Sequence, residues 1–131
     1  MPIGPNQNEI HLRTAIRTAA SQTHTPYNLI LIENGETQAT TTDIIKQASE
    51  KWPDVIRIGR EPKPGTAYAL DAALKMVDSD TVYMTKNDSD DIFYKDREKN
   101  RVAVFQKLPD SVTIVYDDFL QLIYEPRPFV Q

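Results

Sequence analysis

Short apolar segments alternate with amphipathic segments along most of the chain. Residues 9–20 carry apolar side chains at the spacing of one helical face: Leu12, Ala15, Ile16 and Ala19. The same spacing predicts further helices over residues 40–52, 66–77 and 95–108. Short apolar runs bounded by turn residues predict strands over residues 27–32, 54–59, 81–86 and 111–118.

Strands that alternate with helices of this length form βαβ units, so we expect an α/β, Rossmann-like fold with a mostly parallel sheet flanked by helices. Residues 1–118 are expected to form one domain. Residues 119–131 contain two prolines and are expected to form an extended C-terminal tail.

Composition narrows the functional classes. The chain has 131 residues, 40% hydrophobic and 26% charged, with a net charge of −4, which argues against nucleic acid as a partner. No apolar run is long enough for membrane insertion. Cysteine is absent, which excludes disulfides and thiolate metal sites and suits a cytoplasmic protein.

Three polar loops follow the first three predicted strands. They read ENGE (33–36), GREPKPG (59–65) and NDSDD (87–91). In a parallel sheet, loops at the carboxyl ends of strands share one edge, where ligands bind. We therefore expect the three loops to lie together.

The NDSDD loop has two interpretations. Aspartate, asparagine and serine oxygens are hard ligands that suit a divalent cation such as Mg²⁺, Mn²⁺ or Ca²⁺. The same residues are also common in turns, where they cap backbone N–H groups. The loop residues alone leave both interpretations open.

The other two loops are similarly ambiguous when each is considered alone. Asn34-Gly35 is a strong turn signal. Arg60 and Lys63 are the basic residues expected near the acids, and Gly65 precedes a predicted helix whose N-terminus would favour an anion. Together, the acids, the bases and the helix N-terminus suit a nucleotide diphosphate bound through a metal ion.

With these motifs in order, the chain resembles the nucleotide-binding half of the inverting, GT-A-fold family 2 glycosyltransferases. The resemblance covers residues 2–118. It begins with a strand-end P-x-x-N, a helix ending in AASQT and an apolar strand closing on ENGE. It continues with GREPKPGTAYALDAAL, a strand, the D-x-D-D of NDSDD, and a helix.

The resemblance implies a metal site. Asp88 and Asp90 match the D-x-D motif that binds Mn²⁺ or Mg²⁺ against the diphosphate, so Asp88 also belongs to the nucleotide site. Asp91 would orient the loop or the donor sugar.

The resemblance also implies a nucleoside site, with a UDP-sugar as the expected donor. Glu33 and Asn34 match the acidic pair that reads the base, although the family usually has two aspartates there. Pro2 and Asn6 would touch the nucleoside, and Arg60 would approach the phosphates.

The catalytic residues stay unknown, because the family's downstream catalytic carboxylate has no identified counterpart. Asp117 and Asp118 are the late acidic pair, and a strand-end cap or a solvated pair is the favoured interpretation of them. Three hypotheses follow: a small or truncated metal-dependent inverting glycosyltransferase, a non-catalytic module derived from it, and a Rossmann-like regulator with a Mg²⁺ site. The sugar, the acceptor and the oligomeric state are left open, with a homo-oligomer among the possibilities.

Overall fold

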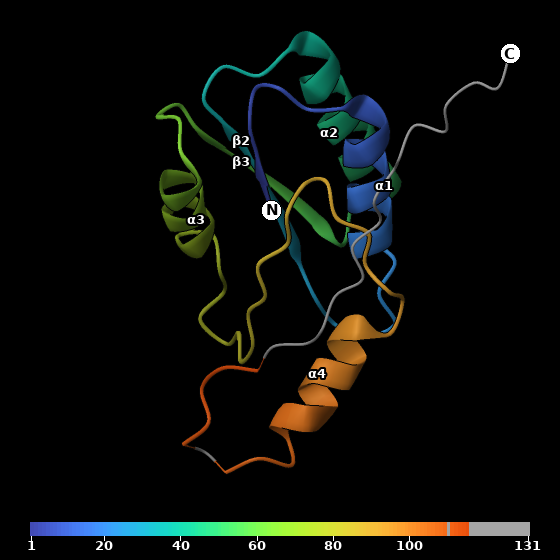
Figure 1. Cartoon of the computed structure of the whole chain (residues 1–131), viewed down its shortest axis with the longest axis vertical. Coiled ribbons are helices and arrows are strands. Elements are labelled where there is room, and N and C mark those ends of the chain that lie inside the picture. Colours follow the sequence, from blue (N-terminus) through green and yellow to red (C-terminus); the bar gives the residue numbers. More distant parts are fainter. Residues whose placement is uncertain (110, 116–131) are drawn as a thin grey trace, which may run out of the picture.

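The computed structural model describes residues 1–109 and 111–115, and its centre is a sheet of three parallel strands (Figure 1). The strands are β1 (Pro2–Ile3), β2 (Leu29–Asn34) and β3 (Ile56–Glu61), in the spatial order β1-β2-β3. Because all three run the same way, their carboxyl ends lie at one edge of the sheet.

Helices cover both faces of the sheet. Those in the described residues are α1 (Glu9–Ala19), α2 (Ala39–Lys51), α3 (Thr66–Leu74) and α4 (Arg97–Phe105). α1 and α2 pack on one face, α3 lies on the other, and α4 sits at the lower end of the molecule (Figure 1). None of the helices in the described part of the chain is long and apolar enough to cross a membrane.

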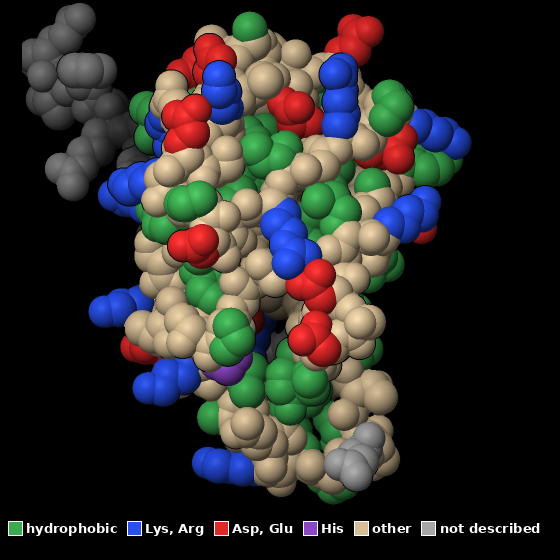
Figure 2. Space-filling model, turned by 180° about the vertical axis from the view of Figure 1, so that it is seen from behind, with side chains coloured by type: hydrophobic (Ala, Val, Ile, Leu, Met, Phe, Trp, Pro, Cys, Tyr) green, Lys and Arg blue, Asp and Glu red, His purple; other side chains and the backbone are tan. Residues whose placement is uncertain are grey.

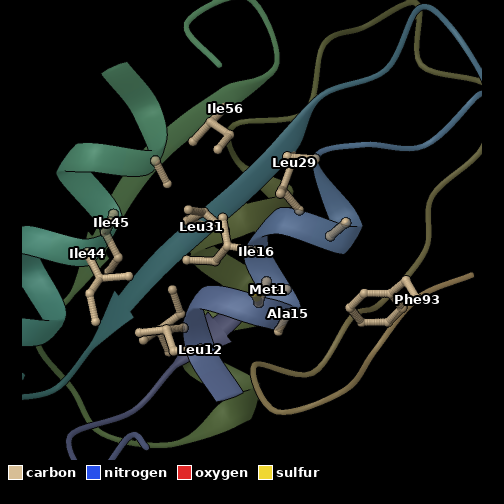
Figure 3. Close-up of a cluster of buried hydrophobic side chains, with 14 residues drawn as sticks. Met1, Leu12, Ala15, Ile16, Leu29, Leu31, Ile44, Ile45, Ile56 and Phe93 are labelled. Atoms are coloured by element: carbon tan, nitrogen blue, oxygen red, sulfur yellow. The ribbon is translucent and has the colours of Figure 1, made fainter. Parts of the chain in front are cut away.

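The main core lies between the sheet and the pair α1 and α2 (Figure 3). Every second residue of β2 points to this face, as the alternation of a strand requires. The core contains, among others, Leu12 and Ile16 from α1, Leu29 and Leu31 from β2, Ile44 and Ile45 from α2, Ile56 from β3, and Phe93 from a later loop.

On the opposite face, a glycine allows the segment after α3 to approach the sheet closely. A Cβ atom at Gly59 would lie 2.6 Å from both Ile32 Cδ1 and Met76 Sδ. The same region is tied to β3 by Arg57, whose guanidinium donates two 2.7 Å hydrogen bonds to the Asp78 carboxylate. These contacts position α3 and therefore the loop that precedes it.

The α/β class with a parallel sheet is confirmed, and each predicted helix is found with slightly different ends. The strands predicted at 27–32 and 54–59 each begin and end two residues later, as β2 and β3. β1 adds a short strand that no predicted range covers.

The strand predicted over residues 81–86 is wrong, because this segment is not paired in the sheet. β1 has only two residues, and Pro2 has no N–H to donate to a neighbouring strand. The segment packs on α4 instead: Tyr83 stacks on Phe105 with ring centroids 5.1 Å apart, and Thr85 Oγ1 accepts a 2.7 Å hydrogen bond from Arg101.

The strand predicted over residues 111–118 is also not observed in its described part, 111–115. An apolar run supplies side chains for burial but not a partner strand. The remainder of that range and the predicted tail, 119–131, lie outside the described residues.

Candidate functional site

The loops that follow β1, β2 and β3 lie at the same edge of the sheet, at the upper end of the molecule in Figure 1. The strand register fixes this arrangement. Ile3 is the partner of Glu33, and Asn34 is the partner of Glu61, so the three strands end almost level. The predicted meeting of the ENGE and GREPKPG loops is therefore observed.

Asn34 joins those two loops. Its side-chain Nδ2 donates hydrogen bonds to the backbone oxygens of Lys63, at 2.8 Å, and Glu61, at 3.3 Å. Its Oδ1 accepts a 2.8 Å hydrogen bond from the N–H of Gly65. Asn34 is buried, so its amide is committed to shaping the loop at the start of α3. Its predicted contact with a base stays a prediction.

Glu33 faces the first turns of α2. Its Oε1 accepts a 2.6 Å hydrogen bond from the Thr42 hydroxyl and a 3.3 Å hydrogen bond from the Thr37 hydroxyl. Arg60 is the register partner of Glu33 on β3 and is exposed. The edge thus presents a carboxylate held by two hydroxyls beside an exposed guanidinium.

The NDSDD loop reaches this edge from the β1 side. Ser89 Oγ donates a 2.9 Å hydrogen bond to Oε1 of Gln7, which lies in the loop after β1. Asn87 is buried, and its Oδ1 accepts a 2.7 Å hydrogen bond from Arg97 at the start of α4. Within residues 1–109 and 111–115, no hydrogen bond joins residues 87–91 directly to residues 33–36 or 59–65.

Asp88 is paired with a lysine that the sequence interpretation did not place there. Lys86 Nζ lies 2.9 Å from Asp88 Oδ1, and both side chains are about half exposed. The α-amino group of Met1 is near this pair. Burial lowers the pKa of this amine to about 6, while Asp88 raises the pKa and Lys86 lowers it. The expectation that Arg60 and Lys63 are the basic residues nearest the acids was therefore incomplete.

The remaining acids of the loop are open to solvent. Asp90 and Asp91 are exposed, and neither has a hydrogen-bond or ion-pair partner in the described residues. In that same part of the chain, no three Asp, Glu, His or Cys side chains gather closely enough to hold a metal by themselves.

The donor atoms nevertheless fit a divalent cation. Mg²⁺ is commonly held by one or two protein carboxylates and completes its shell with phosphate oxygens and water. Asp90 is free for this role, and Asp88 is held only by an exposed ion pair, a kind of contact that contributes little. The metal assignment to Asp88 and Asp90 stays a prediction.

The other two residues of the predicted nucleoside site lie on the β1 side of the edge. Pro2 is half-buried in β1, and Asn6 is exposed in the loop after it. The structure thus brings all predicted site residues to one edge or to a loop anchored on it. Only Asn34 is buried among them.

Two further residues belong to this region, and both had a detectable signal in the sequence. Lys86 immediately precedes NDSDD, and Gln7 lies in the polar GPNQN segment after β1. Lys63 was expected at this edge, and its Nζ lies 3.8 Å from the centre of the Tyr68 ring at the start of α3, a contact that depends on how the loop folds.

Comparison with known proteins agrees with this arrangement. The family model described as glycosyl transferase family 2 matches residues 5–120. No curated protein and no solved structure gives a significant match to the chain.

Proposed function

The chain belongs to glycosyl transferase family 2, and from this premise we propose that it binds a nucleotide-sugar, with a UDP-sugar as the expected donor. The observation that carries the proposal is the 2.9 Å Ser89–Gln7 hydrogen bond, which anchors the acidic loop at the carboxyl edge. Parallel α/β sheets bind ligands at this edge.

The nucleoside would lie over the ends of β1 and β2. Glu33 is the acceptor proposed for the N–H of a uracil base, and its two threonine contacts hold the carboxylate in place. Pro2 and Asn6 would line the other side. Asn34 contributes by holding the loop before α3, as its three hydrogen bonds indicate.

The diphosphate would lie between β3 and the acidic loop. Arg60 and Lys63 are exposed cations at this edge. Asp88 and Asp90 would hold Mn²⁺ or Mg²⁺, and Asp91 would orient the donor sugar. When bound, the cation neutralises the diphosphate and stabilises it as a leaving group.

The proposed reaction is metal-dependent, inverting transfer of the sugar to an acceptor that is not identified. Such a transfer needs a base for the acceptor hydroxyl, and general-base assistance is worth on the order of 10²–10⁴ in rate. Asp117 and Asp118, the late acidic pair, lie outside the described residues. The alternative is a non-catalytic GT-A-derived module that binds the donor without transferring the sugar.

Calorimetry with UDP, GDP and ADP, each with and without Mn²⁺, tests donor binding. We expect UDP to bind, and only with the metal. Asp90→Asn should weaken this binding at least about tenfold, which is ~1.4 kcal/mol. Asp54→Asn is the matched control, because Asp54 is an exposed aspartate before β3, at the opposite edge. Failure of any nucleotide to bind would contradict the proposal.

Diphosphate release from a panel of nucleotide-sugars separates the enzyme from the binding module. We expect slow, metal-dependent hydrolysis, because water needs no acceptor pocket. Turnover that rises strongly with one acceptor would establish a complete transferase. Tight, metal-dependent binding with no release would instead establish the non-catalytic module.

A further inference from the structure

The segment that carries the acidic loop NDSDD (87–91) is held to the rest of the protein by little apolar burial. Beyond residue 77, Asn87 and Phe93 are the only buried residues of the described chain. Most of the large exposed apolar side chains also lie in this stretch, and Figure 2 shows apolar side chains at the surface of the lower part of the molecule, where α4 lies. The position of the acidic loop therefore depends on a small number of specific contacts.

Those contacts come largely from α1 and from the loop that follows it. Phe93 belongs to the main core, and its backbone N–H donates a 3.2 Å hydrogen bond to the Thr18 hydroxyl. In the loop after α1, the backbone N–H of Thr23 donates a 3.0 Å hydrogen bond to the Lys95 oxygen. The Thr23 hydroxyl donates a 2.6 Å hydrogen bond to the Asp96 carboxylate. The residues just after the acidic loop are thus fixed to the carboxyl end of α1.

Gln22 is the centre of this attachment. Its side chain is buried, and both ends of its amide form hydrogen bonds. Nε2 donates to the Tyr94 oxygen, at 2.9 Å, and to the Thr18 oxygen, at 3.0 Å. Oε1 accepts a 3.2 Å hydrogen bond from the backbone N–H of Glu98. One side chain therefore joins α1, the residues after the acidic loop and the first turn of α4.

The acidic residues lie between this attachment and a second one at the other end of α1. Ser89 is bound to Gln7, just before α1 begins. Four residues later, Phe93 is bound to Thr18 in the last turn of that helix. An α-helix has a fixed rise per residue, so α1 sets the distance between the two anchors. It thereby restricts the conformations open to Asp90, whose carboxylate has no partner in the described residues.

We propose that α1 holds the acidic loop at both ends and that Gln22 positions the far end, so that the divalent-cation affinity of Asp88 and Asp90 depends on Gln22. Ligands that are already ordered bind more tightly than ligands that must become ordered on binding. Loss of the Gln22 amide would leave the Tyr94 oxygen and the Glu98 N–H without this partner and would loosen that end of the segment. The dependence of cation affinity on Gln22 rests on the proposed function, whereas the anchoring does not.

Gln22→Met tests the anchor, because methionine keeps the length and the apolar stem of the side chain but has no N–H donor and only a weak acceptor. Titration of the full chain with Mn²⁺ alone, followed by electron paramagnetic resonance, should show binding weakened at least about fivefold. Thr18→Val, which removes the hydroxyl that binds Phe93 but keeps the shape of the side chain, should act in the same direction.

Ile45→Val is the matched control. Ile45 is buried on α2, on the side of the core away from Phe93 (Figure 3), so shortening its side chain lowers stability without altering the anchor. The Mn²⁺ affinity of this variant should equal that of the unaltered chain.

Amide hydrogen exchange tests the anchoring without any cation. Phe93 is the decisive probe, because its hydrogen-bond partner Thr18 is unaltered in Gln22→Met. Its exchange, measured by NMR relative to the amides of β2, should become at least about tenfold faster in Gln22→Met, since local opening of the segment no longer breaks the Gln22 contacts. In Ile45→Val the relative rate of Phe93 should not rise.

Mn²⁺ binding that is equally tight in Gln22→Met and in the unaltered chain would overturn the proposal, as would an unchanged relative exchange rate of Phe93. An equal loss of affinity in Ile45→Val would also overturn it, because general stability would then be the cause. If the unaltered chain binds no Mn²⁺, the metal assignment fails, and the exchange of Phe93 decides the anchoring by itself.

Discussion

Asn34 Oδ1 accepts a 2.8 Å hydrogen bond from the backbone N–H of Gly65, a residue 31 positions further along the chain. Gly65 has a φ of 132°, a conformation that favours glycine, and it immediately precedes α3. One buried amide at the end of β2 therefore determines where the loop after β3 turns and where α3 begins. The shape of the loop at this edge of the sheet therefore depends on the Asn34 side chain even without a ligand.

Replacement of Asn34 by alanine tests that dependence. The change removes three hydrogen bonds and leaves the Lys63 oxygen and the Gly65 N–H without this partner. We expect the free energy of unfolding to fall by about 1–3 kcal/mol in urea denaturation. Asn28→Ala is the control, because Asn28 is exposed and has only a 3.4 Å contact to Asp78. Equal effects of the two changes would contradict the assigned role.

Gly59→Ala tests the close approach of Met76 to the sheet. The new Cβ would lie 2.6 Å from side-chain atoms of Ile32 and Met76, so one of them must move. Both atoms lie near the ends of side chains that can shift, so we expect a loss of only about 1 kcal/mol in unfolding free energy, measured by urea denaturation. At Gly4 the nearest atom to a new Cβ is 3.8 Å away, so Gly4→Ala should have a much smaller effect. A neutral or stabilising Gly59→Ala would contradict the close approach of Met76 to the sheet.

Lys86→Gln tests whether the acidic loop receives a cation. Lys86 and a divalent ion would compete for Asp88, so removal of the lysine should strengthen Mn²⁺ binding. Exposed ion pairs are worth about 0.2–1 kcal/mol, so we expect an increase of up to about fivefold. The measurement is titration with Mn²⁺ alone, followed by electron paramagnetic resonance. Lys46→Gln should change nothing, and weaker binding in Lys86→Gln would count against the metal assignment.

The buried α-amino group of Met1 predicts a pH dependence of stability. This amine donates a 2.8 Å hydrogen bond to the Ile30 oxygen, and burial lowers its pKa from 8.0 to about 6. Between these values the unfolded chain binds more protons than the folded chain, so the unfolding free energy rises from pH 6 to pH 8. The pKa difference is worth roughly 2–3 kcal/mol.

Urea denaturation at pH 6, 7 and 8 measures this effect in a chain that begins at Met1. Nα-acetylation removes the titrating amine but retains an N–H donor. The difference in stability between the free and acetylated chains should therefore change across this range. A constant difference would show that the amine is not buried.

Much of the fold follows from local pattern. The apolar stripe of α1 and the apolar run of β2 are visible in the sequence, because burial selects side chains at the period of the element that carries them. The alternation of such elements determines the α/β class, and a parallel sheet then brings the loops after β2 and β3 together. The positions of Glu33 and Arg60 could therefore be predicted.

Only the tertiary structure decided what the segment at 81–86 does. Its apolar residues favour a strand, but a strand needs a neighbour with free N–H and C=O groups, and β1 offers two residues. The partners of the site residues were equally hidden. Asn34 binds the backbone of a loop 29 to 31 residues further along the chain, a contact that packing sets and no local pattern records. Periodicity reports which side of an element is buried, whereas the identity of the group it meets depends on how the whole chain closes on itself.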